Sequence, residues 1–232
     1  LKTMLEYKNL ELGGCYHQAP MSYPALLSWC EKKAEQFAPY ITDTGNYIAA
    51  ALSNHQKVVL EAQLGAMRDI DYGIFPYTSS SSTISAYGPI GAGIPGTSPD
   101  HIIGVLKAYS TCVGAGPFTA EKAMPEKWME SLRKSGGEYG AATGRPRRVG
   151  PFDAIASAYG LKCQNADKIA LTKLDVLSRM DEIPVITAYK LNDELITEFD
   201  PLDDLDSMTP VIQMLPGWNT DISKCRKYEE LP

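Results

Sequence analysis

Lys168-Ile169-Ala170-Leu171-Thr172-Lys173-Leu174-Asp175 is the stretch on which the prediction of the fold depends. A short apolar run that ends in polar residues is typical of a buried strand. Similar runs predict further strands at 57–60, 102–111, 183–190 and 195–198. Helical spacing and capping residues predict helices over 22–37, 43–54 and 124–134, and another that begins at Pro151. This pattern indicates an α/β fold, a central sheet flanked by helices, in a single unit over residues 1–232.

The composition excludes several classes of protein. With 232 residues, 44% hydrophobic and 22% charged, the chain can bury one sizeable core. A net charge of −6 argues against a general nucleic-acid binder. No stretch approaches the ~20 apolar residues of a membrane span, and there is no secretory signal. Five scattered cysteines without a Cys-x-x-Cys pair indicate reduced thiols. We therefore expect a cytoplasmic protein that binds neither nucleic acid nor membrane.

An arginine-rich loop lies shortly before the opening stretch. Residues 140–148 read Gly-Ala-Ala-Thr-Gly-Arg-Pro-Arg-Arg. Planar guanidinium groups suit phosphate and carboxylate, and glycines let backbone N–H groups approach an anion closely. At a strand end, Lys173 and Asp175 can hold a guanine, because the carboxylate accepts two N–H bonds while the lysine stem lies along the base. Together the two segments predict a site for anionic substrates beside a guanine nucleotide.

Other candidate groups have simpler explanations. Asp69-Ile70-Asp71 could be a metal-binding carboxylate pair, but a strand-end turn with solvated acids is favoured. The run Ser79–Thr83 fits a phosphate cradle and a flexible polar loop equally well. The three histidines have neither ligand spacing nor an evident carboxylate partner, so they receive no catalytic role. The three tryptophans are interpreted as core or cap residues.

The order of motifs resembles the adenylosuccinate synthetase family, which couples inosine monophosphate (IMP) to aspartate with GTP. The motifs that carry the resemblance are Asp69–Gly73, Phe75–Tyr77, Leu106–Thr111, Val113–Phe118, Glu138–Gly140, Thr143–Arg148, Leu171–Leu177 and Leu215–Trp218. The resemblance covers essentially the whole chain. It implies the P-loop GTPase-like synthetase fold, a homodimer and a ligase of purine nucleotide biosynthesis that uses Mg²⁺.

The resemblance also implies roles for individual residues. Arg145, Ser79 and Leu64 correspond to the residues that bind IMP. Leu64 stands where the family has a glutamine, and it could offer only its backbone. The GTP site corresponds to Arg147, Lys173, Leu174 and Asp175. The loop that closes over L-aspartate corresponds to Ala141, Ala142, Thr143, Gly144, Arg145, Pro146 and Arg147.

Two departures from the family leave alternatives open. The glycine-rich phosphate segment, with its catalytic aspartate and following histidine, is not found in residues 1–232. We therefore expect a fragment that is incomplete at the N-terminus, inactive alone, and without the catalytic and metal-binding residues. The stretch 82–87 also differs from the family pattern. One alternative is a variant that acts on another purine nucleotide, such as a 2-amino purine. The other is a non-catalytic nucleotide-binding module.

Overall fold

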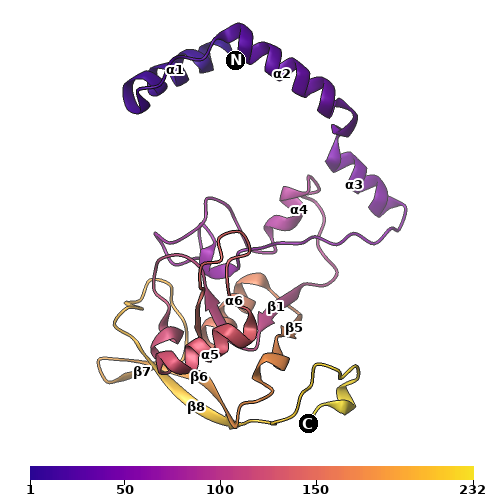
Figure 1. Ribbon diagram of the computed structural model, residues 1–232. Helices are drawn as coiled ribbons and strands as arrows, with labels where there is room; N and C mark the ends of the chain where they lie inside the picture. Colours follow the sequence, from indigo (N-terminus) through magenta and orange to yellow (C-terminus); the bar gives the residue numbers. More distant parts are fainter. The chain divides into compact units, whose positions relative to one another are not determined.

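A computed structural model describes all 232 residues (Figure 1). The chain separates into two compact parts, Leu1–Lys57 and Val58–Pro232. The expected single unit over residues 1–232 depends on how these parts associate, and it stays a prediction. No helix is both long and apolar enough to cross a lipid bilayer.

The first part is entirely helical. It contains α1 (Lys2–Tyr16), α2 (Tyr23–Phe37), a 3₁₀ turn (Ala38–Tyr40) and α3 (Thr44–Ser53). The predicted helices at 22–37 and 43–54 are confirmed. Asp43 caps α3, because its side chain accepts a hydrogen bond from the Asn46 backbone N at 3.0 Å. Ser22 has the extended backbone of an N-cap, but its side chain makes no capping bond.

The second part contains both helices and strands. Its helices are α4 (Tyr87–Gly91), α5 (Glu126–Gly136) and α6 (Ala154–Gln164), with 3₁₀ turns at Ala66–Arg68, Thr119–Lys122, Leu174–Leu177 and Tyr228–Glu230. Its strands are β1 (Ile103–Lys107), β2 (Ser110–Cys112), β3 (Arg148–Gly150), β4 (Phe152–Asp153), β5 (Lys168–Thr172), β6 (Glu182–Leu191), β7 (Glu194–Ile196) and β8 (Thr209–Pro216). The α/β class is confirmed.

The strands form three sheets rather than one central sheet. Strand β1 pairs in parallel with β5, and β2 pairs antiparallel with β3. In the four-stranded sheet, β6 pairs in parallel with β4. It pairs antiparallel with both β7 and β8 (Figure 1). The β1–β5 register places Lys107 beside Thr172, so the end of β1 lies next to the Lys173–Asp175 segment.

Several predicted elements need correction. Residues 57–60 form no strand, and Val59 is 89% exposed, so no sheet buries this apolar run. The run 102–111 is two strands, β1 and β2. Pro151 does not start a helix. It is buried, and α6 begins after Asp153, whose carboxylate accepts the Ala156 N–H at 3.0 Å.

The core consists of two clusters joined by β6. Ile183 belongs to the first cluster and Ile186 to the second, which also contains the buried Tyr189. Trp128 and Trp218 pack against the first cluster, as predicted, whereas Trp29 is exposed. The remaining buried residues of the first cluster are Ala108, Tyr109, Met129, Leu132, Val149 and Leu177. The inner face of α5 thus packs beside β3 and the turn Leu174–Leu177, near the candidate site.

Candidate functional site

The arginine loop is a hairpin whose base is closed by backbone contacts. Three cross-strand contacts close it: Arg147 N to Glu138 O at 3.0 Å, the Tyr139–Pro146 bridge, and Gly140 N to Arg145 O at 2.8 Å. At the tip, Gly144 has a φ of +64° and donates to the Gly140 carbonyl at 2.8 Å. A side chain at that φ would be strained, so glycine suits this turn. Residues 141–145 are exposed, and a ligand can therefore reach them.

The two predicted anion-binding arginines differ in their surroundings. The Arg145 side chain is exposed and makes no hydrogen bond or ion pair with the chain. The Arg147 Nη1 donates to Glu138 Oε2 at 2.9 Å, and its Nε is buried without a partner. The Arg147 carbonyl also accepts from Arg133 Nε at 2.9 Å. Arg147 is therefore held in place, whereas Arg145 is free to adapt to a ligand.

Glu138 is the buried centre of the site and is only 2% exposed. Its carboxylate accepts bonds from Lys107 Nζ at 2.9 and 3.1 Å and from the Tyr109 hydroxyl at 2.6 Å, besides that from Arg147. Burial by itself would raise the pKa of Glu138, but the bonds from Tyr109 and Lys107 and the nearby positive charges lower it below the usual glutamate value. Burial raises the pKa of Tyr109, so its hydroxyl stays protonated and can donate. Glu138 is thus kept ionised.

The predicted guanine-reading segment lies against the same corner. Lys173, in a left-handed backbone conformation, follows β5, and its Nζ donates to the Gly136 carbonyl at 3.0 Å. Gly136 ends α5, two residues before Glu138. Leu174 packs against the first core cluster, while Asp175 is exposed. The structure therefore places Lys173 and Arg147 near the same Gly136–Glu138 segment, and their roles as guanine and anion ligands stay predictions.

Leu64 and Ser79 lie in a different loop system. Leu64 is exposed, and the next carbonyl, that of Gly65, accepts from Thr83 Oγ1 at 2.9 Å. Ser79 Oγ lies 3.0 Å from the Ser81 carbonyl. No hydrogen bond or ion pair connects Leu64 or Ser79 with Arg145. Their shared role in IMP binding stays a prediction.

Asp69 differs from both interpretations of the Asp69–Asp71 pair. It is fully buried, and its oxygens accept the backbone N–H groups of Asp71, Tyr72 and Thr83 at 2.9, 3.1 and 2.6 Å. Burial opposes ionisation, but these bonds lower the pKa of Asp69 overall. Asp69 is a buried acceptor that organises its loop, so the expectation of a solvated acid was wrong for it.

Histidine 101 also has a partner that the sequence did not reveal. The His101 Nδ1 lies 2.8 Å from Asp167 Oδ2. The same carboxylate accepts the Ile102 backbone N–H through its other oxygen at 2.8 Å. All three groups are at the start of the β1–β5 pair, on the surface. The Asp167 carboxylate thus links the residues before β1 to the residue before β5.

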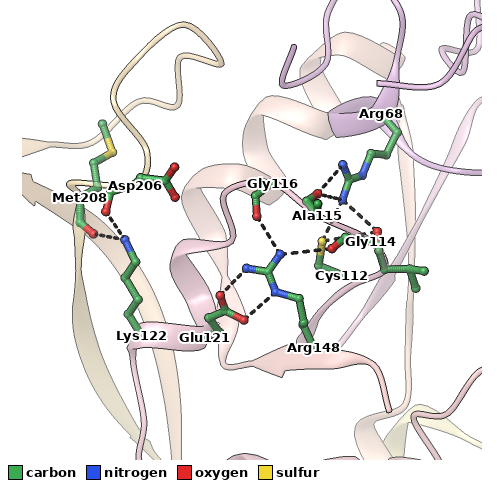
Figure 2. A network of polar contacts seen from close by, with 11 residues as sticks. Arg68, Cys112, Gly114, Ala115, Gly116, Glu121, Lys122, Arg148, Asp206 and Met208 are labelled. Atoms are coloured by element: carbon green, nitrogen blue, oxygen red, sulfur yellow. Dashed lines mark hydrogen bonds and ion pairs between the residues drawn. The ribbon is translucent and has the colours of Figure 1, made fainter. Parts of the chain in front are cut away.

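The last arginine of the loop, Arg148, fastens a neighbouring turn (Figure 2). It forms an ion pair with Glu121 and donates to the Gly116 carbonyl at 2.7 Å. Arg68 donates to the carbonyls of Val113 and Ala115 at 3.0 and 3.2 Å. The turn at 113–116 is thus held by two guanidinium groups from different segments. Arg148 serves the protein's own backbone, in contrast to the free Arg145.

A cavity of about 400 Å³ lies beside the base of the arginine loop. Arg133, Arg147 and Arg148 line it, together with Glu121 and Glu126. The chain contains no group of three or more histidine, cysteine, aspartate or glutamate side chains that could hold a metal ion.

Sequence reasoning did not assign a role to Lys107, Tyr109 or Glu138. All three lie within motifs that carried the resemblance, Leu106–Thr111 and Glu138–Gly140. The available signal was an acidic residue directly before an arginine-rich loop in an acidic protein. It could not identify the partners, because Lys107 and Glu138 are 31 residues apart in the chain.

Comparisons with known proteins agree with this structure. A family model described as adenylosuccinate synthetase matches residues 1–232. The adenylosuccinate synthetase of Carboxydothermus hydrogenoformans is 40% identical over 233 residues, which is 100% of this chain and 54% of that protein. That of Koribacter versatilis is 39% identical over 233 residues, with coverage of 100% and 52%.

A solved structure extends the similarity to three dimensions. The structure of fully ligated adenylosuccinate synthetase from Plasmodium falciparum matches with a TM-score of 0.85 and 32% sequence identity. The match covers 100% of this chain and 55% of that one. The chain spans about half the length of the curated relatives it matches. From the match of both sequence and fold, we conclude that this chain belongs to the adenylosuccinate synthetase family.

Proposed function

We propose that the protein containing this chain ligates L-aspartate to IMP with GTP, forming adenylosuccinate in purine nucleotide biosynthesis. The observation that carries the proposal is the meeting of Arg147 and Lys173 at the Gly136–Glu138 corner. Such a ligase must hold aspartate near the γ-phosphate of GTP and the guanine at the other end of the same nucleotide, so both segments should lie along one nucleotide-binding region. The related proteins are named adenylosuccinate synthetase, and no observation favours either a 2-amino purine substrate or a non-catalytic module.

We assign the substrates to separate parts of this region. Arg145 binds IMP, helped by Ser79 and by the backbone of Leu64. Loop residues 141–147 close over L-aspartate, whose carboxylate Arg147 binds. Lys173, Leu174 and Asp175 bind the guanine of GTP, with Arg147 on the GTP side. Support for Arg145 is its exposed side chain without a partner, which leaves its donors for a phosphate.

The proposed reaction has two steps. A base removes a proton from the purine, and the 6-oxygen attacks the γ-phosphate of GTP, which releases GDP. The aspartate amine then displaces the 6-phosphoryl group as phosphate. In these steps the chain's arginines would orient aspartate through charge-assisted bonds and stabilise the transferring phosphoryl group by their positive charge. The family supplies the base from its glycine-rich segment, so we expect residues 1–232 alone to be inactive.

Mg²⁺, a homodimer and a cytoplasmic location complete the proposal. When bound, Mg²⁺ would neutralise phosphate charge during transfer, with ligands mainly from the family's phosphate segment. We propose the homodimer and the cytoplasmic location by analogy with the family. A measurement of mass in solution and an activity assay with the metal removed would test the first two.

Steady-state kinetics of the intact protein would test the site. Arg147→Leu should raise the aspartate KM and lower kcat, whereas Arg145→Leu should raise the IMP KM. Lysine at either position should restore little, because a point charge cannot reproduce a bidentate fork. Arg179→Leu is the matched control, since Arg179 is exposed and makes no hydrogen bond or ion pair.

Two results would contradict the site assignment or the proposed function. A basic turn without function predicts that all variants stay within about twofold of wild type, because exposed charges contribute little. Near-wild-type constants for both leucine variants would remove the site assignment. Absence of adenylosuccinate from the wild-type reaction would remove the proposed function.

A further inference from the structure

We propose that Glu138 is a positioning residue for aspartate, which acts by fixing the direction of the Arg147 guanidinium. The inference rests on the proposed function, in which Arg147 binds the substrate carboxylate. Glu138 does not touch substrate in this proposal. It lies behind the loop, almost fully buried, and acts through Arg147.

Glu138 holds Arg147 at two points. Its backbone carbonyl accepts the Arg147 N–H at 3.0 Å, and its carboxylate accepts from Nη1 at 2.9 Å. The first contact sets the position of the Arg147 backbone, and the second sets the direction of its side chain. A long arginine side chain has many rotamers in solution, and ordering it in advance reduces the entropy lost on binding.

The carboxylate of Glu138 is itself oriented. Tyr109 donates to Oε1 at 2.6 Å, and Lys107 bridges both oxygens at 2.9 and 3.1 Å. Oε2 therefore faces Arg147 while Oε1 is occupied by Tyr109. Since the bonds to Tyr109 and Lys107 do not depend on Arg147, the carboxylate can direct the arginine rather than follow it.

The bonding pattern leaves one side of the guanidinium for a ligand. Nη1 is used by Glu138, and Nε is buried without a partner. Nη2 has no partner in the chain and is not among the buried unpartnered atoms. Arg147 also lines the cavity of about 400 Å³ beside the loop, which provides room for an anionic group. One buried carboxylate facing two cations leaves a net positive charge for that group.

The test measures kinetics of the intact protein and its Glu138→Gln variant, which keeps the shape but removes the charge. We expect the aspartate KM to rise about tenfold or more and kcat to fall, because a misdirected group loses much of its effect. The IMP KM should stay within about twofold. Glu130→Gln is the matched control, since Glu130 lies in α5 and pairs with Lys134 on the surface.

A double-mutant cycle separates positioning from a general structural role. If Glu138 acts through Arg147, then Glu138→Gln should change the aspartate KM by less than about twofold in an Arg147→Leu background. Independent, additive effects in the cycle, or an equal rise of all three substrate KM values, would overturn the proposal.

Glu138→Asp decides the question if the glutamine variant does not fold. It keeps the charge, but its side chain is one methylene shorter and should not reach Arg147. We expect a raised aspartate KM, and a wild-type value would refute the positioning role. Failure of the proposed function is distinct: the wild-type protein would then form no adenylosuccinate. An active wild type with unaffected Glu138 variants contradicts the positioning proposal alone.

Discussion

Two buried carboxylates, Glu138 at the arginine loop and Asp153 at the start of α6, have opposite surroundings. They are 2% and 5% exposed. Glu138 faces the cations Lys107 and Arg147, whereas Asp153 forms no salt bridge and accepts bonds from the Tyr189 hydroxyl at 2.8 and 2.7 Å. Similar burial therefore coincides with very different electrostatics.

The pKa values of the two groups move in opposite directions. Burial raises the pKa of Asp153, and the bonds from Ala156 N and Tyr189 offset only part of this effect. At Glu138 burial also acts to raise the pKa, but hydrogen bonds and nearby cations outweigh it. A helix cap needs only an acceptor, while a residue that directs an arginine needs a charge.

The largest expected effect is that of Glu138→Gln. In the intact protein it should lower the free energy of unfolding by about 3 kcal/mol at neutral pH, because Lys107 and Arg147 lose their shared buried anion. The lowered pKa means that this stabilisation is present above the usual glutamate pKa and is lost as the pH falls through the lowered value. Thermal melting at neutral and successively lower pH should show the difference between wild type and variant shrinking.

Asp69 is a third buried carboxylate, and it has no salt-bridge partner. The effect of Asp69→Asn on the free energy of unfolding should be intermediate. We expect a loss of about 2 kcal/mol, because an amide N–H₂ group would face backbone N–H donors where an oxygen now accepts them. Asp71→Asn is the control, since Asp71 is exposed. Equal melting temperatures of the two variants would show that the donors around Asp69 contribute little.

Tyr189→Phe should have a smaller effect, about 1 kcal/mol, because Asp153 keeps the bond from Ala156 N. Without the hydroxyl, the pKa of Asp153 should rise further. Denaturant unfolding at neutral pH measures the loss, and Tyr228→Phe, at an exposed tyrosine, serves as the control. A loss as large as that of Glu138→Gln would contradict the contrast between the two carboxylates.

Asp153→Asn should have the smallest effect on the free energy of unfolding, and it can raise this free energy rather than lower it. At neutral pH the free energy of unfolding should change by no more than about 0.5 kcal/mol, because asparagine is an equally good helix cap. The raised pKa means that the contribution of Asp153 is present below its unfolded pKa and is lost as the pH rises through the folded value. The free energy of unfolding of the variant should therefore increase relative to that of wild type as the pH rises. A relative decrease would contradict the raised pKa of Asp153.

Local sequence signals predicted much of the secondary structure. The helices at 22–37 and 43–54 and strands β5 and β6 follow from residue patterns within a few positions of each other. The errors occurred where a distant segment decides. Residues 57–60 have the composition of a strand but no partner strand, and β8 was missed although it pairs along β6. Strand pairing depends on neighbours that local propensity does not specify.

The sequence by itself determined the α/β class, the family, and the two segments proposed to bind anions and guanine. Only the tertiary structure decided that Arg145 is free, that Arg147 is held, and that Glu138 lies buried between Lys107 and Tyr109. It also decided that Asp69 and Asp153 are buried rather than solvated. The physical reason is that motifs specify chemical groups, whereas the charge and direction of each group depend on burial and on hydrogen-bond partners far away in the chain.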